Sequence, residues 1–89
     1  MDSYSIKWKQ SAQRELKKLG KDIILKILDR VQSLAENPHP VGSRKLKGSE
    51  YTYRIRVGEY RIVYALRNTI LTIEIIRVGH RREIYRKLT

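Results

Sequence analysis

The chain has 89 residues, of which 20 are Lys or Arg and 9 are Asp or Glu, so its formal net charge is +11. A chain of this length buries only somewhat more than about 60% of its unfolded surface, which excludes two separate cores and predicts one domain over residues 1–89. Because such an excess of positive charge repels itself unless an anion is near, we expect a polyanionic partner, and nucleic acid is the leading candidate.

Cysteine usage and apolar run length exclude several further classes. The chain contains no cysteine, which rules out a disulfide framework and a thiolate metal site. Neither His39 nor His80 stands near another plausible ligand, so no metal or other cofactor is expected. No apolar run approaches the roughly 18 residues of a membrane span, and residues 1–8 contain no signal-peptide core. We therefore predict a cytoplasmic protein with no membrane partner.

The beginning of the chain predicts a strand followed by a helix. Apolar and polar residues alternate over Tyr4–Trp8, which is the pattern of a strand with one buried face. Ser11 is a candidate N-cap for the helix, and Gly20 stands where the helix end would turn left-handed. The apolar residues of this first helix recur at helical spacing: Ala12, Leu16 and Leu19.

The next segment predicts a second helix, with a stronger apolar face. It ends before Asn37-Pro38, because a residue that precedes proline disfavours helical geometry. The two helices are expected to form an antiparallel hairpin. The apolar face of the second helix consists of Ile24, Ile27, Leu28, Val31, Leu34 and Ala35.

Residues 39–49 are rich in proline, glycine and basic residues, and their structure stays open. Lys45-Leu46-Lys47-Gly48 fits either a short strand or an extended loop.

Three runs with β-strand character follow, at Tyr51–Val57, Tyr60–Leu66 and Ile70–Val78. Gly58-Glu59 and Asn68-Thr69 separate them as two-residue hairpin loops, which makes the three runs an antiparallel meander. The fold class predicted from this order is α+β, an antiparallel sheet with an N-terminal helical hairpin packed on one face. The tail, residues 81–88, is predicted to be a short helical or irregular segment.

The first hairpin register separates two kinds of side chain. With Gly58-Glu59 as the loop, Arg56 stands directly opposite Arg61, and Arg54 lies diagonal to them. Like charges directly opposite on a sheet cost roughly 0.2–1 kcal/mol per pair, so stability alone does not favour this arrangement. An anionic ligand would relieve it, although simple solvated arginines on a basic protein remain the alternative. The opposite, core face receives Tyr51, Tyr53, Ile55, Val57, Tyr60, Ile62, Tyr64 and Leu66.

The third run extends both faces. Leu71, Ile73 and Ile75 are expected on the core face, with Thr72, Glu74 and Ile76 beside the arginines. Glu74 either braces Arg61 or simply balances charge. Histidine is a common proton-transfer residue, and His80 is either a surface residue or part of the arginine site. Tyr85 is either a core anchor or a platform on which a base stacks.

Taken in order, these motifs resemble the RelE/ParE toxin superfamily over essentially the whole chain. The residues that carry the resemblance are Leu46-Lys47-Gly48, Tyr53-Arg54-Ile55-Arg56-Val57-Gly58, Tyr60-Arg61-Ile62-Val63-Tyr64, Val78-Gly79-His80-Arg81 and Tyr85. The resemblance implies the RelE fold. It also implies one of two activities, because the RelE branch cuts messenger RNA on the ribosome and the ParE branch inhibits DNA gyrase without enzymatic activity.

The resemblance also implies roles for particular residues, and they favour the nuclease branch. Arg54 and Arg56 match basic residues that contact the scissile phosphate, and Arg61 matches an arginine proposed to stabilise the transition state. Arg81 and Tyr85 match the C-terminal arginine and tyrosine of that site, and His80 or Arg81 would assist proton transfer. Lys45 and Lys47 are expected to bind RNA with Arg54 and Arg56. Founding members have lysine where Arg54 and Arg56 stand, which leaves the general base unassigned because arginine is a poor proton acceptor.

The function predicted by this resemblance is that of a type II toxin–antitoxin toxin. It would act as a ribosome-dependent, metal-independent endoribonuclease that cleaves messenger RNA through 2′-hydroxyl attack and so inhibits translation. The implied partners are a cognate antitoxin in a hetero-oligomer, the ribosome and messenger RNA. The alternatives are a ParE-like gyrase inhibitor and an RNA-binding module without catalysis.

Overall fold

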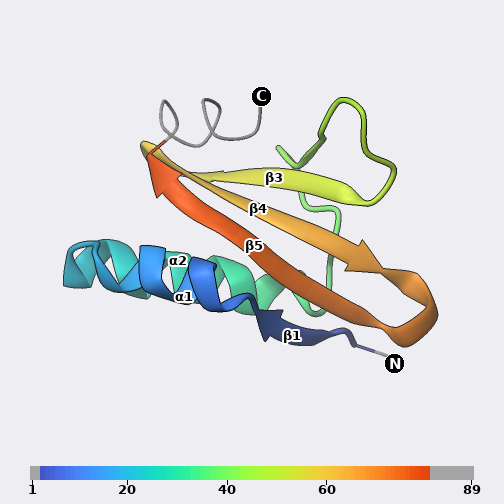
Figure 1. Ribbon diagram of the computed structural model, residues 1–89, viewed down its shortest axis with the longest axis horizontal. Coiled ribbons are helices and arrows are strands. Elements are labelled where there is room, and N and C mark those ends of the chain that lie inside the picture. Colours follow the sequence, from blue (N-terminus) through green and yellow to red (C-terminus); the bar gives the residue numbers. More distant parts are fainter. Residues whose placement is uncertain (1–2, 81–89) are drawn as a thin grey trace.

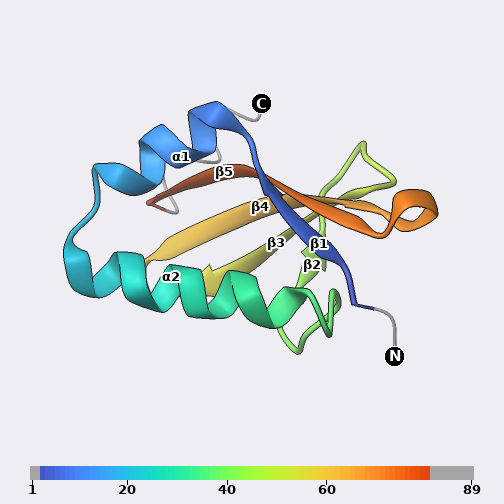
Figure 2. The same cartoon turned by 90° about the horizontal axis from the view of Figure 1, so that it is seen from below.

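Two helices cover one face of a five-stranded sheet in the computed structural model, which describes residues 3–80 (Figure 1). Helix α1 packs against β5 and helix α2 lies over β3. Figure 2 shows both helices on the same face of the sheet. The predicted order of strand, two helices and meander is confirmed. The elements are β1 (Ser5–Trp8), α1 (Gln10–Lys17), α2 (Lys21–Leu34), β2 (Arg44–Lys45), β3 (Thr52–Val57), β4 (Tyr60–Arg67), the 3-10 turn η1 (Asn68–Ile70) and β5 (Thr72–His80).

The strand order is β1-β5-β4-β3-β2, and the sheet is mixed rather than wholly antiparallel. Strand β1 runs parallel to β5, with Ser5 opposite Thr72 and Trp8 opposite Ile75. The prediction of an antiparallel sheet is therefore wrong for this one pair. An alternating pattern identifies the buried face of a strand but carries no information about its direction, which here depends on how the helical segment returns the chain to the sheet.

The hairpin between β3 and β4 has the predicted register. Val57 is opposite Tyr60 and Arg56 is opposite Arg61. Gly58 has a φ of 59°, which is the left-handed geometry that a tight hairpin loop requires and that glycine adopts without steric cost.

The hairpin between β4 and β5 differs from the prediction in two ways. Its loop is longer, because η1 and Leu71 occupy it, and Leu71 has a φ of 46° and is 39% exposed instead of facing the core. The register also shifts between Val63 and Tyr64, where Ile76 has no partner of its own on β4. This β-bulge returns Val78 to the helix face, so the predicted alternation holds only up to Ile75.

The core lies between the helices and the sheet. Most of the predicted core residues are buried there, but Tyr51 and Leu28 are 55% and 41% exposed, so their predicted places in the core are wrong. In α2, Ile23 packs against the core. The buried cluster consists of Ala12, Ile27, Val31, Leu34, Ile55, Val57, Ile62, Tyr64, Leu66, Ile73, Ile75 and Val78.

The predicted caps of α1 are also wrong. The helix begins two residues earlier than expected, so Lys9 is its N-cap and Ser11 lies inside the first turn. Gly20 has a φ of −68° and serves as the N-cap of α2, so the chain passes between the helices without the predicted left-handed glycine. Within residues 3–80, neither helix is long and apolar enough to cross a membrane.

Candidate nucleic-acid interface

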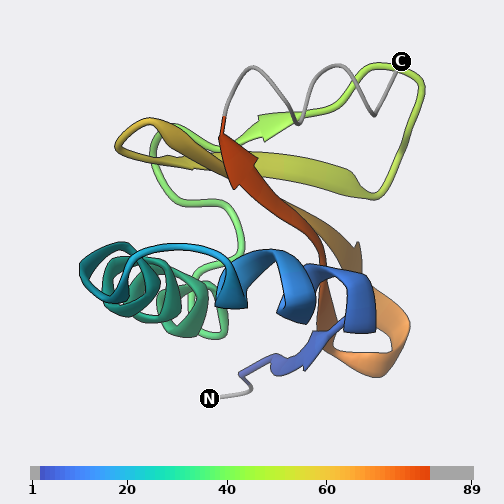
Figure 3. The same cartoon turned by 60° about the vertical axis from the view of Figure 1, so that its left-hand side comes forward.

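Four arginines form two directly opposed pairs on the face of the sheet that the helices leave uncovered. Arg56 of β3 is opposite Arg61 of β4, and Arg44 of β2 is opposite Arg54 of β3. Directly opposite residues on neighbouring strands point to the same face. We call the surface formed by Arg44, Arg54, Arg56 and Arg61 the arginine face. Figure 3 shows β2 and β3 at the edge of the sheet remote from β1.

The four guanidinium groups differ in burial. Arg61 is only 7% exposed and is the one charged residue in the buried class over the described part of the chain, whereas Arg54 is half-buried and Arg44 and Arg56 are exposed. Burial leaves Arg61 few rotamers, and a lower local dielectric strengthens its attraction for an anion that comes near. Guanidinium also stays charged at any accessible pH and offers a forked set of donors that matches phosphate oxygens. The arrangement is therefore suited to holding a phosphodiester.

Gly79 keeps the surface beside Arg61 open. It is the residue of β5 directly opposite Arg61 and so would direct a side chain to the arginine face. A Cβ built on Gly79 would meet nothing within 4 Å, and the glycine does not adopt a positive φ. Neither packing nor backbone geometry therefore requires glycine here. A side chain at this position would project on the same face as Arg61, into space that Gly79 leaves unfilled.

The structure does not bring His80 together with the arginines. His80 is opposite Tyr60, which packs against the core on the helix face, and the two rings meet edge to face with centroids 5.8 Å apart. Both residues line a hollow together with Lys18 and Leu19. A proton-transfer role for His80 beside Arg61 therefore has no support from this placement.

The two predicted RNA-binding lysines are also separated from the arginine face. Lys45 is opposite Tyr53, which packs against the core, so Lys45 points to the other side of the sheet from its neighbour Arg44. Lys47 is exposed in the loop that follows β2. The predictions for Arg81 and Tyr85 lie outside the described residues.

Glu74 does not lie beside Arg61, so the interpretation in which Glu74 braces Arg61 is wrong. Its partner on β4 is Ala65, four residues along the strand from Arg61, and its carboxylate lies 3.5 Å from the Arg67 guanidinium. The charge-balancing interpretation fits this contact.

Sequence reasoning missed Arg44, although it completes the second pair. The segment around it has no alternating pattern, and its strand is only two residues long, so no local signal indicated that Arg44 would pair with Arg54. The one available clue was a basic residue at the edge of a segment that fitted either a strand or a loop.

A buried tyrosine anchors the loop that carries Arg44. The hydroxyl of Tyr64 donates a hydrogen bond of 2.7 Å to the carbonyl of Pro38. Burial raises the pKa of Tyr64 to about 12, and a hydrogen bond with Ser43 offsets this rise only in part. Tyr53 stacks on Tyr64 with ring centroids 5.9 Å apart, and His39 meets Tyr53 edge to face at 5.0 Å. These contacts fix both ends of residues 38–43 against the sheet.

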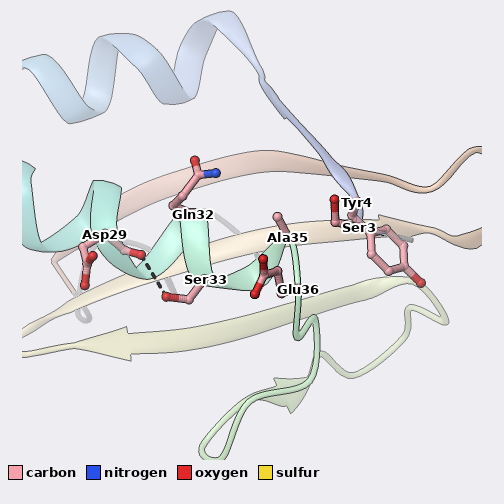
Figure 4. Close-up of a pocket in the computed structure, with 7 residues that line it drawn as sticks. All are labelled: Ser3, Tyr4, Asp29, Gln32, Ser33, Ala35 and Glu36. Carbon is pink, nitrogen blue, oxygen red and sulfur yellow. Dashed lines mark hydrogen bonds between the residues drawn. The ribbon is translucent and has the colours of Figure 1, made fainter. Parts of the chain in front are cut away.

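A second hollow lies at the C-terminal end of α2 and has the opposite electrostatic character (Figure 4). It encloses about 340 Å³, and Asp29 and Glu36 supply its charged groups. The hydroxyl of Ser33 donates to the backbone carbonyl of Asp29 within it. No residue of the arginine face lines this hollow. Over residues 3–80, His, Asp and Glu side chains do not gather in the groups of three that a metal ion would need.

The protein is a small, strongly basic α+β domain with paired arginines on the sheet face opposite the helices, and such concentrated positive charge is a feature that proteins which bind polyanions share. Comparison with known proteins identifies the family. The sequence model of the ParE toxin of type II toxin–antitoxin systems, parDE, matches residues 6–85, and the chain belongs to this RelE/ParE toxin family.

Two curated relatives span nearly the same length. Toxin RelG of Mycobacterium tuberculosis is 31% identical over 85 residues, which cover 94% of this chain and 98% of that protein. A putative RelE-like toxin protein of Escherichia coli is 32% identical over 80 residues, which cover 88% of this chain and 83% of that protein.

Solved structures show the same fold. A mutant of E. coli toxin RelE in the free state superposes with a TM-score of 0.80 at 25% identity, covering 94% of this chain and 92% of that one. The toxin–antitoxin complex RelBE2 of M. tuberculosis contains a chain that matches with a TM-score of 0.78 at 28% identity, covering 89% of this chain and 99% of that one. The RelE-like fold predicted from the sequence is confirmed.

Proposed function

We propose that this toxin is a ribosome-dependent endoribonuclease that cleaves messenger RNA. The observation that carries the proposal is the direct opposition of Arg56 and Arg61 on the sheet face opposite the helices, where Arg61 is buried and the residue across from it on β5 is Gly79. This geometry suits a phosphate that gains negative charge during a reaction, because fixed donors stabilise developing charge without having to reorganise. The naming of curated relatives as RelE and RelG toxins supports the same branch of the family.

The chemistry follows from the nucleophile that RNA itself supplies. The 2′-hydroxyl oxygen attacks the adjacent phosphorus, the bond from phosphorus to the 5′-oxygen breaks, and the proton lost by the 2′-hydroxyl is balanced by one gained at the leaving 5′-oxygen. The products are a 2′,3′-cyclic phosphate and a 5′-hydroxyl end. Arg54 and Arg56 hold the backbone, and Arg61 stabilises the charge of the pentacoordinate phosphorane. An internal nucleophile needs no metal-bound water, and an all-deoxy strand should survive.

The arginine face supplies charge stabilisation but no good proton acceptor, because a guanidinium keeps its proton at any accessible pH. We therefore assign positioning of the substrate, and part of the proton transfer, to the ribosome, and we expect little cleavage of naked RNA. The excess positive charge docks the toxin on ribosomal RNA in the cytoplasm, so binding should weaken steeply as salt rises.

The partner that restrains this activity is a cognate antitoxin. Several solved relatives are complexes of RelE with RelB, from M. tuberculosis, Pyrococcus horikoshii and E. coli. By the same arrangement, this chain would form a hetero-oligomer with an antitoxin segment of acidic or amphipathic character that folds on binding and blocks the arginine face.

A gyrase inhibitor is the second candidate, because the matching family description names the ParE toxin. In that case the arginine face would have no catalytic role, and the same fold would act only by binding.

Translating ribosomes separate these possibilities when they are incubated with the wild type, Arg56→Gln or Arg61→Gln. Arg14→Gln, in the exposed part of α1, is the matched control, because it removes the same charge away from the arginine face. We expect the wild type and the control to cut messenger RNA and both arginine-face variants to lose cleavage by at least about tenfold.

A parallel supercoiling assay with DNA gyrase completes the experiment. Inhibition of gyrase by all four proteins, without cuts in the message, would favour the second candidate. Binding to ribosomes without either activity would indicate an RNA-binding module.

A further inference from the structure

The arginine face contains two rows of cations rather than one cluster. Arg44 and Arg54 form one row across β2 and β3, and Arg56 and Arg61 form the other across β3 and β4. Arg54 and Arg56 are two residues apart on β3, so the rows lie about 7 Å apart along the strand. This spacing is comparable with the separation between successive phosphates of a single nucleic-acid strand.

The row that contains Arg44 is held in place by contacts on both sides of β2. Before it, the hydroxyl of Tyr64 donates to the carbonyl of Pro38 at 2.7 Å. After it, the backbone N–H of Leu46 donates to the carbonyl of Thr52 at 2.8 Å. The same loop is closed by Ser49, whose hydroxyl donates to that of Thr52 at 2.7 Å and accepts from the backbone N–H of Thr52 at 3.1 Å.

The contacts on both sides of β2 keep the charge of Arg44 opposite that of Arg54. A two-residue strand with no outer neighbour would fray if it had only its own ladder bonds, and an arginine on a frayed loop would turn away from Arg54. Here the flanking contacts keep two like charges opposed, at a cost of roughly 0.2–1 kcal/mol. Because Arg44 is exposed and Arg54 half-buried, both can reach a ligand on the surface.

We propose that Arg44 and Arg54 bind the phosphodiester next to the one held by Arg56 and Arg61. This inference rests on the proposed function for the identity of the ligand, a single strand of RNA, and adds a second phosphate subsite with Arg44 as a new contributor. Two gripped phosphates fix the direction and register of the strand across the sheet, because one contact alone leaves the chain free to rotate about it. Arg44 is a binding residue in this scheme, and Tyr64 is a positioning residue that acts through the loop.

The test is the salt dependence of equilibrium binding, which counts phosphate contacts independently of cleavage. The probe is a short single-stranded oligoribonucleotide with 2′-O-methyl groups, which cannot supply the nucleophile, and binding is followed by fluorescence anisotropy. For single strands, each neutralised phosphate contributes about 0.7 to the slope of log K against log salt. We expect Arg44→Gln to lower the slope by about that amount beyond the change in Arg14→Gln. Arg44→Lys should retain the wild-type slope, since it keeps the charge.

Two results would overturn the second subsite. One is an equal slope for Arg44→Gln and Arg14→Gln, which would mean that Arg44 contributes only to the general field. The other is an equal loss in Arg44→Lys and Arg44→Gln, which would mean that disturbance of β2 causes the change. Failure of the nuclease proposal would give a different result. The wild-type toxin would leave messenger RNA on the ribosome uncut, while the salt dependence of oligoribonucleotide binding would still show whether Arg44 contacts a phosphate.

Discussion

The two faces of β4 show how neighbouring residues in one strand serve opposite purposes. Ile62 points to the helix face and is fully buried in the core cluster, whereas Arg61 points to the arginine face opposite another arginine. Each contact of Ile62 removes apolar surface from water and stabilises the fold. The like charges of Arg61 and Arg56 repel each other across the hairpin, which opposes folding, and the phosphate that we propose as ligand would relieve this repulsion.

The difference indicates that stability and binding can be changed separately in this domain. Substitutions on the helix face should change the free energy of unfolding, and substitutions on the arginine face should change affinity for phosphates with little loss of stability. The following predictions test this separation, beginning with the largest effect.

Ile62→Ala should lower the free energy of unfolding by about 2–5 kcal/mol, because it removes buried methylene groups and leaves a cavity in a packed core. Urea titration followed by circular dichroism measures this loss. Arg56→Gln, one register step away on the opposite face, should change the same quantity by less than about 1 kcal/mol. Similar losses in the two variants would mean that the faces are not energetically separate.

Tyr64 should make the helix face sensitive to alkaline pH. Its pKa in the folded state is raised from 10.0 to about 12, so its contribution to stability is fully present below pH 10 and is lost as the pH rises through about 12. Two pKa units at roughly 1.4 kcal/mol each set an upper limit of about 3 kcal/mol on this loss.

Comparison with Tyr64→Phe isolates this effect from the titration of lysines. The variant should be about 1 kcal/mol less stable at neutral pH, because the Pro38 carbonyl loses its donor, but it should lose less stability between pH 10 and 12. Parallel alkaline unfolding curves for the two proteins would contradict the assignment.

The two ion pairs of the described region should differ in strength according to their position. Glu15 accepts from the Arg77 guanidinium at 2.8 and 3.0 Å and from the Val78 backbone N–H at 2.9 Å, where α1 meets the free edge of β5. Glu15→Gln should therefore cost about 1 kcal/mol. Glu74→Gln, which removes a 3.5 Å contact to a half-exposed Arg67, should cost no more than about 0.5 kcal/mol in the same thermal melts. A larger loss in Glu74→Gln would reverse the comparison.

Arg56→Gln should slightly stabilise the free protein, by about 0.2–1 kcal/mol at low salt, because it removes one of two directly opposed charges. High salt should diminish this gain, since ions screen exposed charges. Thermal unfolding at low and high ionic strength measures it. Destabilisation at both ionic strengths would show that Arg56 stabilises the fold, and that repulsion between Arg56 and Arg61 does not weaken the free protein.

Local signals in the sequence predicted the parts of the fold that depend on local chemistry. A glycine-containing two-residue loop and strict alternation were sufficient to place Arg56 opposite Arg61. The parallel pairing of β1 and the bulge at Ile76 were missed, because both result from contacts between distant segments and leave no mark on the local pattern.

The candidate site was predicted in part for the same reason. The β3–β4 register placed Arg54, Arg56 and Arg61 on one face, as the structure does. Outside the β3–β4 hairpin the predicted site was wrong or incomplete. His80 lies on the helix face because the bulge changes the alternation before it, and Arg44 joins the site through a strand too short to be recognised.

The parallel pairing of β1 with β5 joins segments far apart in the sequence, which limits the order in which the sheet can form. Ser5 pairs with Thr72, so the first strand made by the ribosome has no partner until nearly the whole sheet has been synthesised. Closure between such distant segments is slow, and emerging chains fold only as their partners become available. The arginine hairpin, formed by β3 and β4, can therefore form before β1 pairs with β5 at the other edge of the sheet. The five-stranded sheet is thus complete only after β5 has been made.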